Sequence, residues 1–109
     1  MSQIWTVKWT EQARCDQAEI IRWTRHCFGT RQAIIYVETI ALAVEALEAG
    51  PDASGVKRRD DLPPGLLLLH IARQGRKGRH FIVFRIADEN TLDVLRILYD
   101  GMDLPTHLP

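Results

Sequence analysis

The feature that most constrains the fold is a pair of long helical segments separated by a single glycine. Thr10 is a good N-cap, and the pattern over residues 11–28 predicts a helix that ends at Gly29. Thr30 then caps a second predicted helix over residues 31–49. Because almost no residues separate the two helices, we expect them to form an antiparallel hairpin.

Four strand patterns flank this hairpin. Residues 4–9 alternate and predict a short strand, and residues 65–74 are apolar on both faces, as expected of a central strand. Two more strands, 80–87 and 91–98, follow and are joined by a tight turn. The order β-α-α-β-β-β predicts a two-layer α+β fold, an antiparallel sheet with the helical hairpin on one face. The 109 residues suit a single domain, 1–109.

The second helix has more apolar residues than one buried stripe needs. Ile35 and Leu42 are seven residues apart and lie on the far side from its main stripe. They either pack against the first helix or form a strip that a partner protein covers. The main stripes are Ala13, Ile20, Ile21, Thr24, Cys27 and Phe28 in the first helix and Ala33, Tyr36, Val37, Ile40, Val44 and Leu47 in the second.

The two cysteines do not predict a disulfide or a metal site. Cys15 and Cys27 are twelve residues apart in one predicted helix, about 18 Å along its axis, so they cannot bridge each other. Free thiols suit a reducing compartment. Since the sequence also has no secretion signal and no apolar run long enough to span a bilayer, we expect a cytoplasmic protein that does not bind membranes. We expect no metal and no cofactor.

Charge is unevenly distributed along a chain whose formal net charge is zero. Residues 1–56 sum to −2, residues 57–85 to +6 and residues 86–109 to −4. Proteins that act on nucleic acid are usually basic overall, because neutralising phosphates provides most of their non-specific affinity. A neutral chain with one basic patch better fits a protein partner or a local anionic ligand, and a solvated loop is the alternative.

Two arginines interrupt the apolar pattern of the last two strands. Arg85 lies in the first of them, and alternation places Arg96 of the second on the same face as Val94. An arginine among apolar residues is costly unless it reaches an acid, water or a ligand. Pairing with a nearby carboxylate such as Asp93 or Asp100 is one explanation for each arginine, and we favour it for Arg96.

The sequence contains no established catalytic motif. Cutting RNA without a metal needs a base, an acid and cations on the phosphate. The candidates have no diagnostic spacing, and there is no glycine-rich phosphate loop, no HExxH and no Ser-His-Asp set. The candidates are His70, Arg73, His80, Arg85 and Tyr99.

Three features together resemble the RelE/ParE superfamily of toxins from bacterial toxin–antitoxin modules. They are the β-α-α-β-β-β order, the strand HFIVFRI and the ending VLRILYDGMDLPTHL. Arg96, Met102 and His107 match the ending of the ParE-like branch, where Tyr99 replaces the customary histidine. Arg85 corresponds to the arginine of the FYR pattern, with one aromatic residue missing. The resemblance covers nearly the whole chain.

The resemblance implies a toxin that a small antitoxin wraps and neutralises. In this superfamily, RelE-like members cut messenger RNA on the ribosome, whereas ParE-like members poison DNA gyrase without known catalysis. The segment after Tyr99, DGMDLPTHLP, lacks the basic, aromatic ending of the ribonucleases, and the net charge is zero. We therefore expect a ParE-like inhibitor of DNA gyrase that makes no direct contact with nucleic acid.

The site residues expected on this basis form two sets. Apolar anchors with a basic rim suit an amphipathic, acidic antitoxin peptide, and the target would contact the sheet face or edge. Two alternatives stay open: a ribosome-dependent endoribonuclease using His80, Arg85 and Tyr99, and a degenerate member that has lost toxicity. The expected antitoxin contacts are Ile35, Leu42, Lys57, Arg58 and Arg59, and the expected target contacts are Arg73, Arg85, Arg96 and Tyr99.

Overall fold

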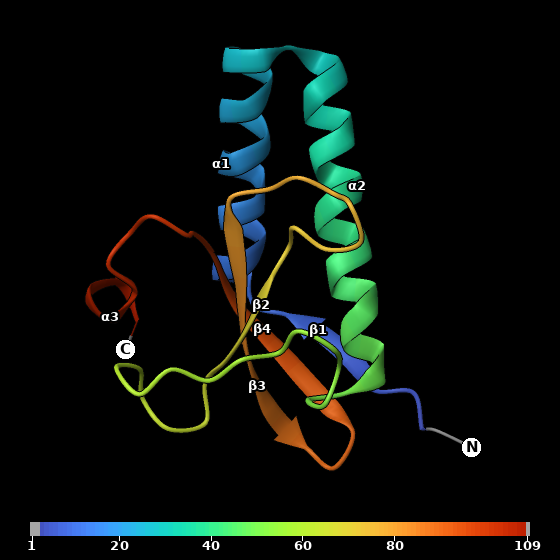
Figure 1. Ribbon diagram of the computed structural model, residues 1–109, viewed down its shortest axis with the longest axis vertical. Helices are drawn as coiled ribbons and strands as arrows, with labels where there is room; N and C mark the ends of the chain where they lie inside the picture. The colour runs from blue at the N-terminus through green and yellow to red at the C-terminus, as the bar shows by residue number, and fades with distance from the viewer. Residues whose placement is uncertain (1–2, 109) are drawn as a thin grey trace.

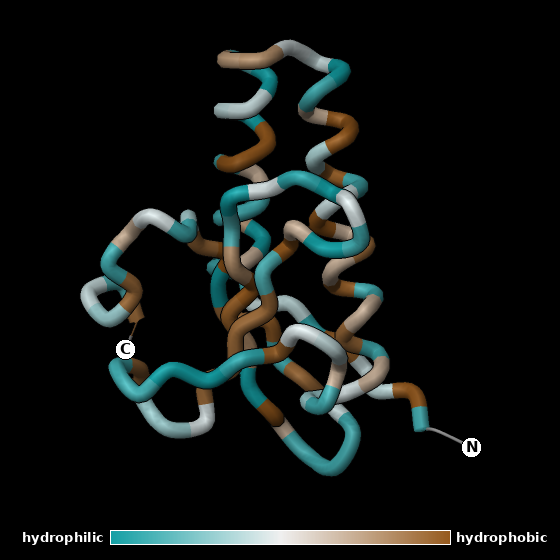
Figure 2. Tube along the Cα trace, viewed as in Figure 1, coloured by the Kyte–Doolittle hydropathy of each residue, from teal (hydrophilic) through white to brown (hydrophobic). Residues whose placement is uncertain are grey.

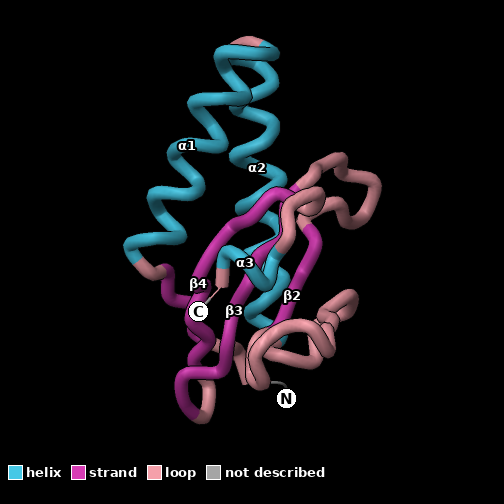
Figure 3. The backbone as a smooth tube through the Cα atoms, turned by 90° about the vertical axis from the view of Figure 1, so that its left-hand side faces the viewer, coloured by secondary structure: helices cyan, strands magenta, loops and turns pink. Residues whose placement is uncertain are grey.

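The computed structural model describes residues 3–108 and has the expected two-layer α+β architecture, in which a helical hairpin packs against one face of a four-stranded sheet (Figures 1 and 3). The strands are β1 (Thr6–Trp9), β2 (Leu67–His70), β3 (His80–Asp88) and β4 (Thr91–Tyr99). The helices are α1 (Glu11–Phe28), α2 (Thr30–Ala46) with a following 3₁₀ turn η1 (Leu47–Ala49), and a short α3 (Leu104–His107) that the sequence did not predict.

The caps of the hairpin helices are partly those expected. The Thr10 hydroxyl accepts a hydrogen bond from the Ala13 N–H at 3.1 Å and donates to the Leu95 carbonyl at 2.9 Å, which ties the start of α1 to β4. Gly29, with a φ of 92°, both ends α1 and serves as the N-cap of α2. Thr30 therefore lies inside α2, and its expected role as the N-cap is wrong, because one glycine makes the whole connection.

The sheet is mixed, with the order β1-β4-β3-β2. Strands β2, β3 and β4 pair antiparallel as expected, but β1 pairs parallel with β4. The hairpin explains this, because it returns the chain to the end of the sheet at which β1 starts, where the Trp5 N–H donates to the Glu48 carbonyl at 2.9 Å. Strand β2 then runs in the same direction as β1, β3 runs opposite, and β4 is parallel to β1 again.

Strand β2 is an edge strand, although its apolar sequence predicted a central one. Leu67 and Leu69 belong to the core beneath the hairpin, and Leu68 belongs to a second cluster on the opposite face. A loop residue, Lys57, pairs with Leu68 across the outer edge of the strand. The hairpin therefore buries one face of β2, and the loop and the C-terminal segment bury the other, although the strand is not central in the sheet.

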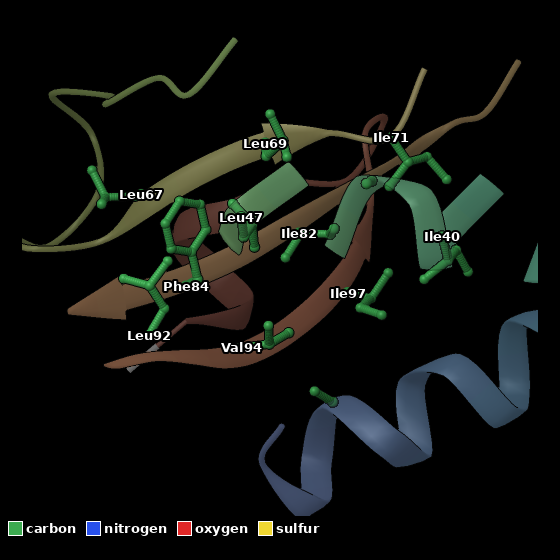
Figure 4. Close-up of a cluster of buried hydrophobic side chains, with 12 residues drawn as sticks. Ile40, Leu47, Leu67, Leu69, Ile71, Ile82, Phe84, Leu92, Val94 and Ile97 are labelled. Carbon is green, nitrogen blue, oxygen red and sulfur yellow. The ribbon is translucent and has the colours of Figure 1, made fainter. Parts of the chain in front are cut away.

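The main core fills the space between the hairpin and the sheet (Figure 4). Phe84 of β3 and Ile40 of α2 are fully buried there, and Trp5, Trp9 and Tyr36 pack around the edge of the cluster. At about 25 cal/mol per Å² of buried apolar area, a cluster of this kind provides most of the stabilisation of a small domain. Its buried members are Ala13, Ile40, Ala43, Leu47, Leu67, Leu69, Ile71, Ile82, Phe84, Leu92, Val94 and Ile97.

The C-terminal segment covers the other face of the sheet. Leu104 of α3 has no exposed surface and packs with Val83 of β3 and Leu98 of β4. Met102 and Leu108 lie at the margin of this second cluster. The segment after β4 is therefore a packed part of the fold.

A bulge in β4 changes which residues share a face. Val83 pairs with Arg96 while the next residue, Phe84, pairs with Val94, so Leu95 is an extra residue. Strict alternation placed Arg96 on the same face as Val94, and this prediction is wrong. Val94 faces the hairpin, whereas Arg96 lies opposite Val83 on the other face.

The end of the hairpin projects beyond the sheet (Figure 1). Brown, apolar positions continue along both helices into this region (Figure 2). Cys27 and Phe28 belong to the predicted apolar stripe of α1 but are exposed, and 61% of the Phe28 surface is accessible. No strand lies beneath this last turn, so the stripe there is not buried.

Candidate protein-binding groove

An open groove of about 760 Å³ lies where the hairpin meets the ends of β3 and β4. Trp23 and Phe28 form one end of it and meet edge to face, with ring centroids 5.7 Å apart. Lys77 and Arg79, from the turn between β2 and β3, add positive charge at the other side. The groove is lined by Glu19, Ile20, Trp23, Thr24, Phe28, Gln32, Tyr36, Lys77, Gly78, Arg79, His80 and Tyr99.

A hydrogen-bonded pair, Tyr36 and His80, forms the floor of the groove. The Tyr36 hydroxyl accepts from the Arg79 N–H at 3.0 Å and shares a second hydrogen bond with the His80 Nδ1, 2.5 Å away. Burial raises the pKa of Tyr36 and lowers the pKa of His80. Both groups are therefore neutral at pH 7, and this part of the groove has no ionised side chain.

A second polar cluster, centred on Asp100, fixes the end of β4. Burial works against its ionisation, but hydrogen bonds from His70 at 2.8 Å and Arg79 at 3.0 Å hold the pKa of Asp100 below its usual range. The Arg79 guanidinium also lies over the Tyr99 ring, 5.4 Å from its centroid. The first residues after β4 are thus held against β2 and β3.

The three residues expected for a nuclease do not come together. His80 and Tyr99 are direct cross-strand partners with ring centroids 6.0 Å apart. Arg85 is five residues further along β3, about 17 Å at the usual rise of a strand. Its guanidinium lies 3.7 Å from Asp93, one of the two carboxylates expected for it.

Arg96 pairs with a carboxylate that the sequence did not indicate. Its guanidinium donates twice to Asp16 of α1, at 2.8 and 3.1 Å, and not to Asp93 or Asp100. Asp16 also accepts from the Ile97 N–H at 3.0 Å. The partner was missed because it lies 80 residues away in the sequence.

The residues expected to bind an antitoxin lie in two separate regions. Ile35 and Leu42 of α2 are 40% and 45% exposed, so neither is fully buried within the hairpin. Leu42 borders a small hollow of about 120 Å³ with Arg73, whose guanidinium donates to the Ser54 carbonyl. The basic loop lies before β2, where Lys57 pairs with Leu68, Arg58 is exposed and Arg59 binds Asp61.

Sequence reasoning missed most of the groove. Trp23 was not assigned to the apolar stripe of α1, and Tyr36 was assigned to the core stripe of α2 alone. A signal existed: Trp23 and Phe28 are large aromatics near the end of a helix that is closed by a one-residue connection, where little sheet remains to cover them.

Residues 3–108 contain no cluster of three or more potential metal ligands. Within the same range, no helix is both long enough and apolar enough to cross a bilayer.

Solved structures identify the class of this fold. The chain is similar to a chain of the chromosomal ParDE toxin–antitoxin system from P. aeruginosa, with a TM-score of 0.72 and 22% identity over 90% of this chain and 98% of that one. It is also similar to a chain of the toxin–antitoxin complex RelBE2 from Mycobacterium tuberculosis, with a TM-score of 0.55 and 22% identity over 88% and 98% of the two chains. The fold is therefore shared with chains of these two toxin–antitoxin systems.

Sequence comparisons then identify the family. Residues 7–104 match the model of the ParE toxin of the type II toxin–antitoxin system parDE. Toxin ParE1 of M. tuberculosis, in strains H37Rv and CDC 1551, is 28% identical over 96 residues, which cover 88% of this chain and 90% of that protein. The chain belongs to the ParE toxin family, which confirms the expected branch.

Proposed function

We propose that this ParE-family toxin inhibits DNA gyrase in the cytoplasm and is kept inactive by a cognate antitoxin that occupies the groove. The observation that carries the antitoxin assignment is the groove itself. It offers the exposed rings of Trp23 and Phe28 beside the cations of Lys77 and Arg79. Aromatic anchors of this kind dominate binding energy at protein interfaces.

The groove chemistry specifies the segment that would bind. An amphipathic helix or extended peptide would place apolar side chains against Trp23 and acidic side chains near Lys77 and Arg79. The neutral Tyr36–His80 floor adds no charge that an apolar side chain would have to desolvate. An antitoxin that wraps the toxin, as the resemblance implies, would extend beyond the groove, so we keep Ile35, Leu42 and the basic loop Lys57–Arg59 as proposed secondary contacts.

The proposal of gyrase as the target rests on the family and on the arrangement of the candidate nuclease residues. The two structurally similar systems named above are toxin–antitoxin complexes, and the family is ParE. Arg85 is about five strand residues from His80 and Tyr99, so these three do not form one phosphate-binding site. For the target contacts we propose Arg73, Arg85, Arg96 and Tyr99, with Arg96 the least available because Asp16 holds its guanidinium.

One observation supports the alternative of a ribosome-dependent endoribonuclease. His80 and Tyr99 face each other in the groove beside Arg79 and Lys77, which is a set of acid–base and cationic groups. If they cut RNA, Tyr99→Phe should abolish cleavage without affecting folding. Unchanged cleavage in that variant would exclude this role for Tyr99.

Induction of the toxin alone in growing bacteria separates the two targets. We expect lost supercoiling and DNA breaks with intact messenger RNA. Transcripts cut at ribosome-occupied codons, with normal supercoiling, would contradict the gyrase assignment. Absence of any growth defect from a soluble, folded protein would instead favour the degenerate, non-toxic member.

A further inference from the structure

We propose that the end of the α1–α2 hairpin, residues 20–37, binds the phosphate backbone of duplex DNA. We call this region the hairpin tip. The inference rests on the proposed function and goes beyond it, because an inhibitor of DNA gyrase acts on an enzyme that holds duplex DNA. It also revises our expectation, drawn from the zero net charge, that this protein makes no direct contact with nucleic acid.

Charge is strongly segregated along the hairpin. The hairpin tip contains Arg22, Arg25 and Arg31 and no aspartate or glutamate, so its formal charge is +3 in a chain whose net charge is zero. The acids of the two helices lie nearer the sheet. They are Glu11, Asp16 and Glu19 before the tip and Glu38 and Glu45 after it.

The arginines of the hairpin tip are exposed and make no ion pairs. Throughout residues 3–108, five other arginines lie within 4 Å of a carboxylate. Arg22, Arg25 and Arg31 are not among them, and His26 beside them is also exposed. Their charges are therefore fully available to an external anion.

Helix stability explains only part of this pattern. Arg25 and His26 lie in the last turn of α1, where the helix dipole favours cations. Arg31 lies in the first turn of α2, where the dipole disfavours a cation, and that turn contains no acid to offset it. The position of Arg31 therefore needs a reason outside the helix.

Phosphate is the anion that this surface fits best. All three cations are arginines, whose planar guanidinium groups donate pairs of hydrogen bonds to phosphate oxygens. The tip projects beyond the sheet (Figure 1), so a long rigid polyanion can reach it without meeting the rest of the molecule. A backbone contact of this kind needs no base-reading side chain and carries no sequence specificity.

The size of the effect follows from counterion release. Three phosphate contacts give a slope of about −2.7 in log affinity against log salt, so binding should weaken about 40-fold between 50 and 200 mM salt. The variant Arg22→Gln/Arg31→Gln, which changes one arginine in each helix, leaves one phosphate contact. Its DNA binding should therefore weaken only about 3-fold over the same range of salt concentration.

The experiment is fluorescence anisotropy of a labelled short duplex titrated with the full chain, without antitoxin, at several salt concentrations. The matched control is Lys8→Gln/Arg14→Gln, which removes the same charge from exposed positions at the sheet end and should keep the full slope. Circular dichroism of each variant verifies folding.

The inference would be overturned by the absence of DNA binding at 50 mM salt, or by equal losses of DNA affinity in the tip and control variants. Tip-dependent binding to phosphatidylglycerol vesicles without binding to DNA would also overturn it, in favour of a lipid surface. A supercoiling assay with purified gyrase distinguishes this failure from that of the proposed function. Gyrase inhibition with no DNA binding refutes the inference alone, and DNA binding without inhibition refutes the proposed target alone.

Discussion

The ion pair between Asp16 and Arg96 gives the sharpest stability prediction. Asp16 is buried in α1, with 8% of its side chain exposed, and accepts from two guanidinium nitrogens of Arg96 and from the Ile97 N–H. We predict that Asp16→Asn lowers the free energy of unfolding by about 3 kcal/mol. Asparagine keeps the shape and one acceptor oxygen, but it leaves the arginine without a counter-charge.

The magnitude comes from the burial of the two partners. Removing one member of a buried pair costs about 3–5 kcal/mol, because the remaining charge is desolvated and unpaired. Arg96 keeps 26% of its side chain exposed, so water recovers some of its hydration and the low end of the range applies. Against a total stability of about 5–15 kcal/mol for a small domain, this loss is easily measured.

The assay is urea unfolding followed by tryptophan fluorescence, with Glu45→Gln on the exposed side of α2 as the control. The control should stay within about 0.5 kcal/mol of the parent protein. The double variant Asp16→Asn/Arg96→Gln should lose at least about 1 kcal/mol less than the sum of the single losses. Additive losses, or a loss for Asp16→Asn no larger than that of the control, would refute this account of the pair.

Three further predictions concern the tail, the floor of the groove and its aromatic wall. Leu104→Ala should lower the free energy of unfolding by about 2–4 kcal/mol, because it opens a cavity under α3, and a loss near zero in urea unfolding would mean that the tail is not packed. The lowered pKa of His80 means that the unfolded chain binds its proton more tightly. The contribution of His80 to the free energy of unfolding is therefore complete above its unfolded pKa, near 6.5, and is lost as the pH falls below that value. His80→Phe should flatten the pH dependence of the free energy of unfolding in this range. An unchanged pH dependence would contradict the assignment of this effect to His80. Trp23→Ala should weaken antitoxin binding in calorimetry by at least about 30-fold, the 2 kcal/mol of an interface hot spot, while Lys8→Gln should leave it unchanged.

Local sequence signals predicted those elements of the fold whose causes are local. Thr10 marked the start of α1 and Gly29 its end, and both helices lie where periodicity placed them, although α2 gives way to a 3₁₀ turn at Leu47. The three antiparallel strands were also found, with β3 and β4 correct to within one residue. In these segments, the pattern of neighbouring residues and the caps decide the structure.

The errors occurred where distant residues decide the structure. The bulge at Leu95 lies where the Thr10 hydroxyl binds the Leu95 carbonyl and Asp16 binds the Ile97 N–H, and these contacts span more than 80 residues. Alternation along β4 contains no sign of them. The groove was missed for the same reason, since Tyr36 and His80 meet across 44 residues. The expected antitoxin contacts Ile35 and Leu42 were recognisable as surplus apolar residues because that signal belongs to one helix.

The parallel pairing of β1 with β4 also has a consequence for folding during synthesis. Thr6 pairs with Thr91 and Trp9 with Val94, so β1, the first of the four described strands to be made, meets its partner strand only after the hairpin, β2 and β3 have been synthesised. At about 5–20 residues per second, the ribosome needs several seconds to produce the chain between them. The hairpin can form early, because its contacts are close in sequence, but the sheet that completes the core cannot close before β4 emerges. Closure of the sheet in the nascent chain is therefore delayed until β4 has been made.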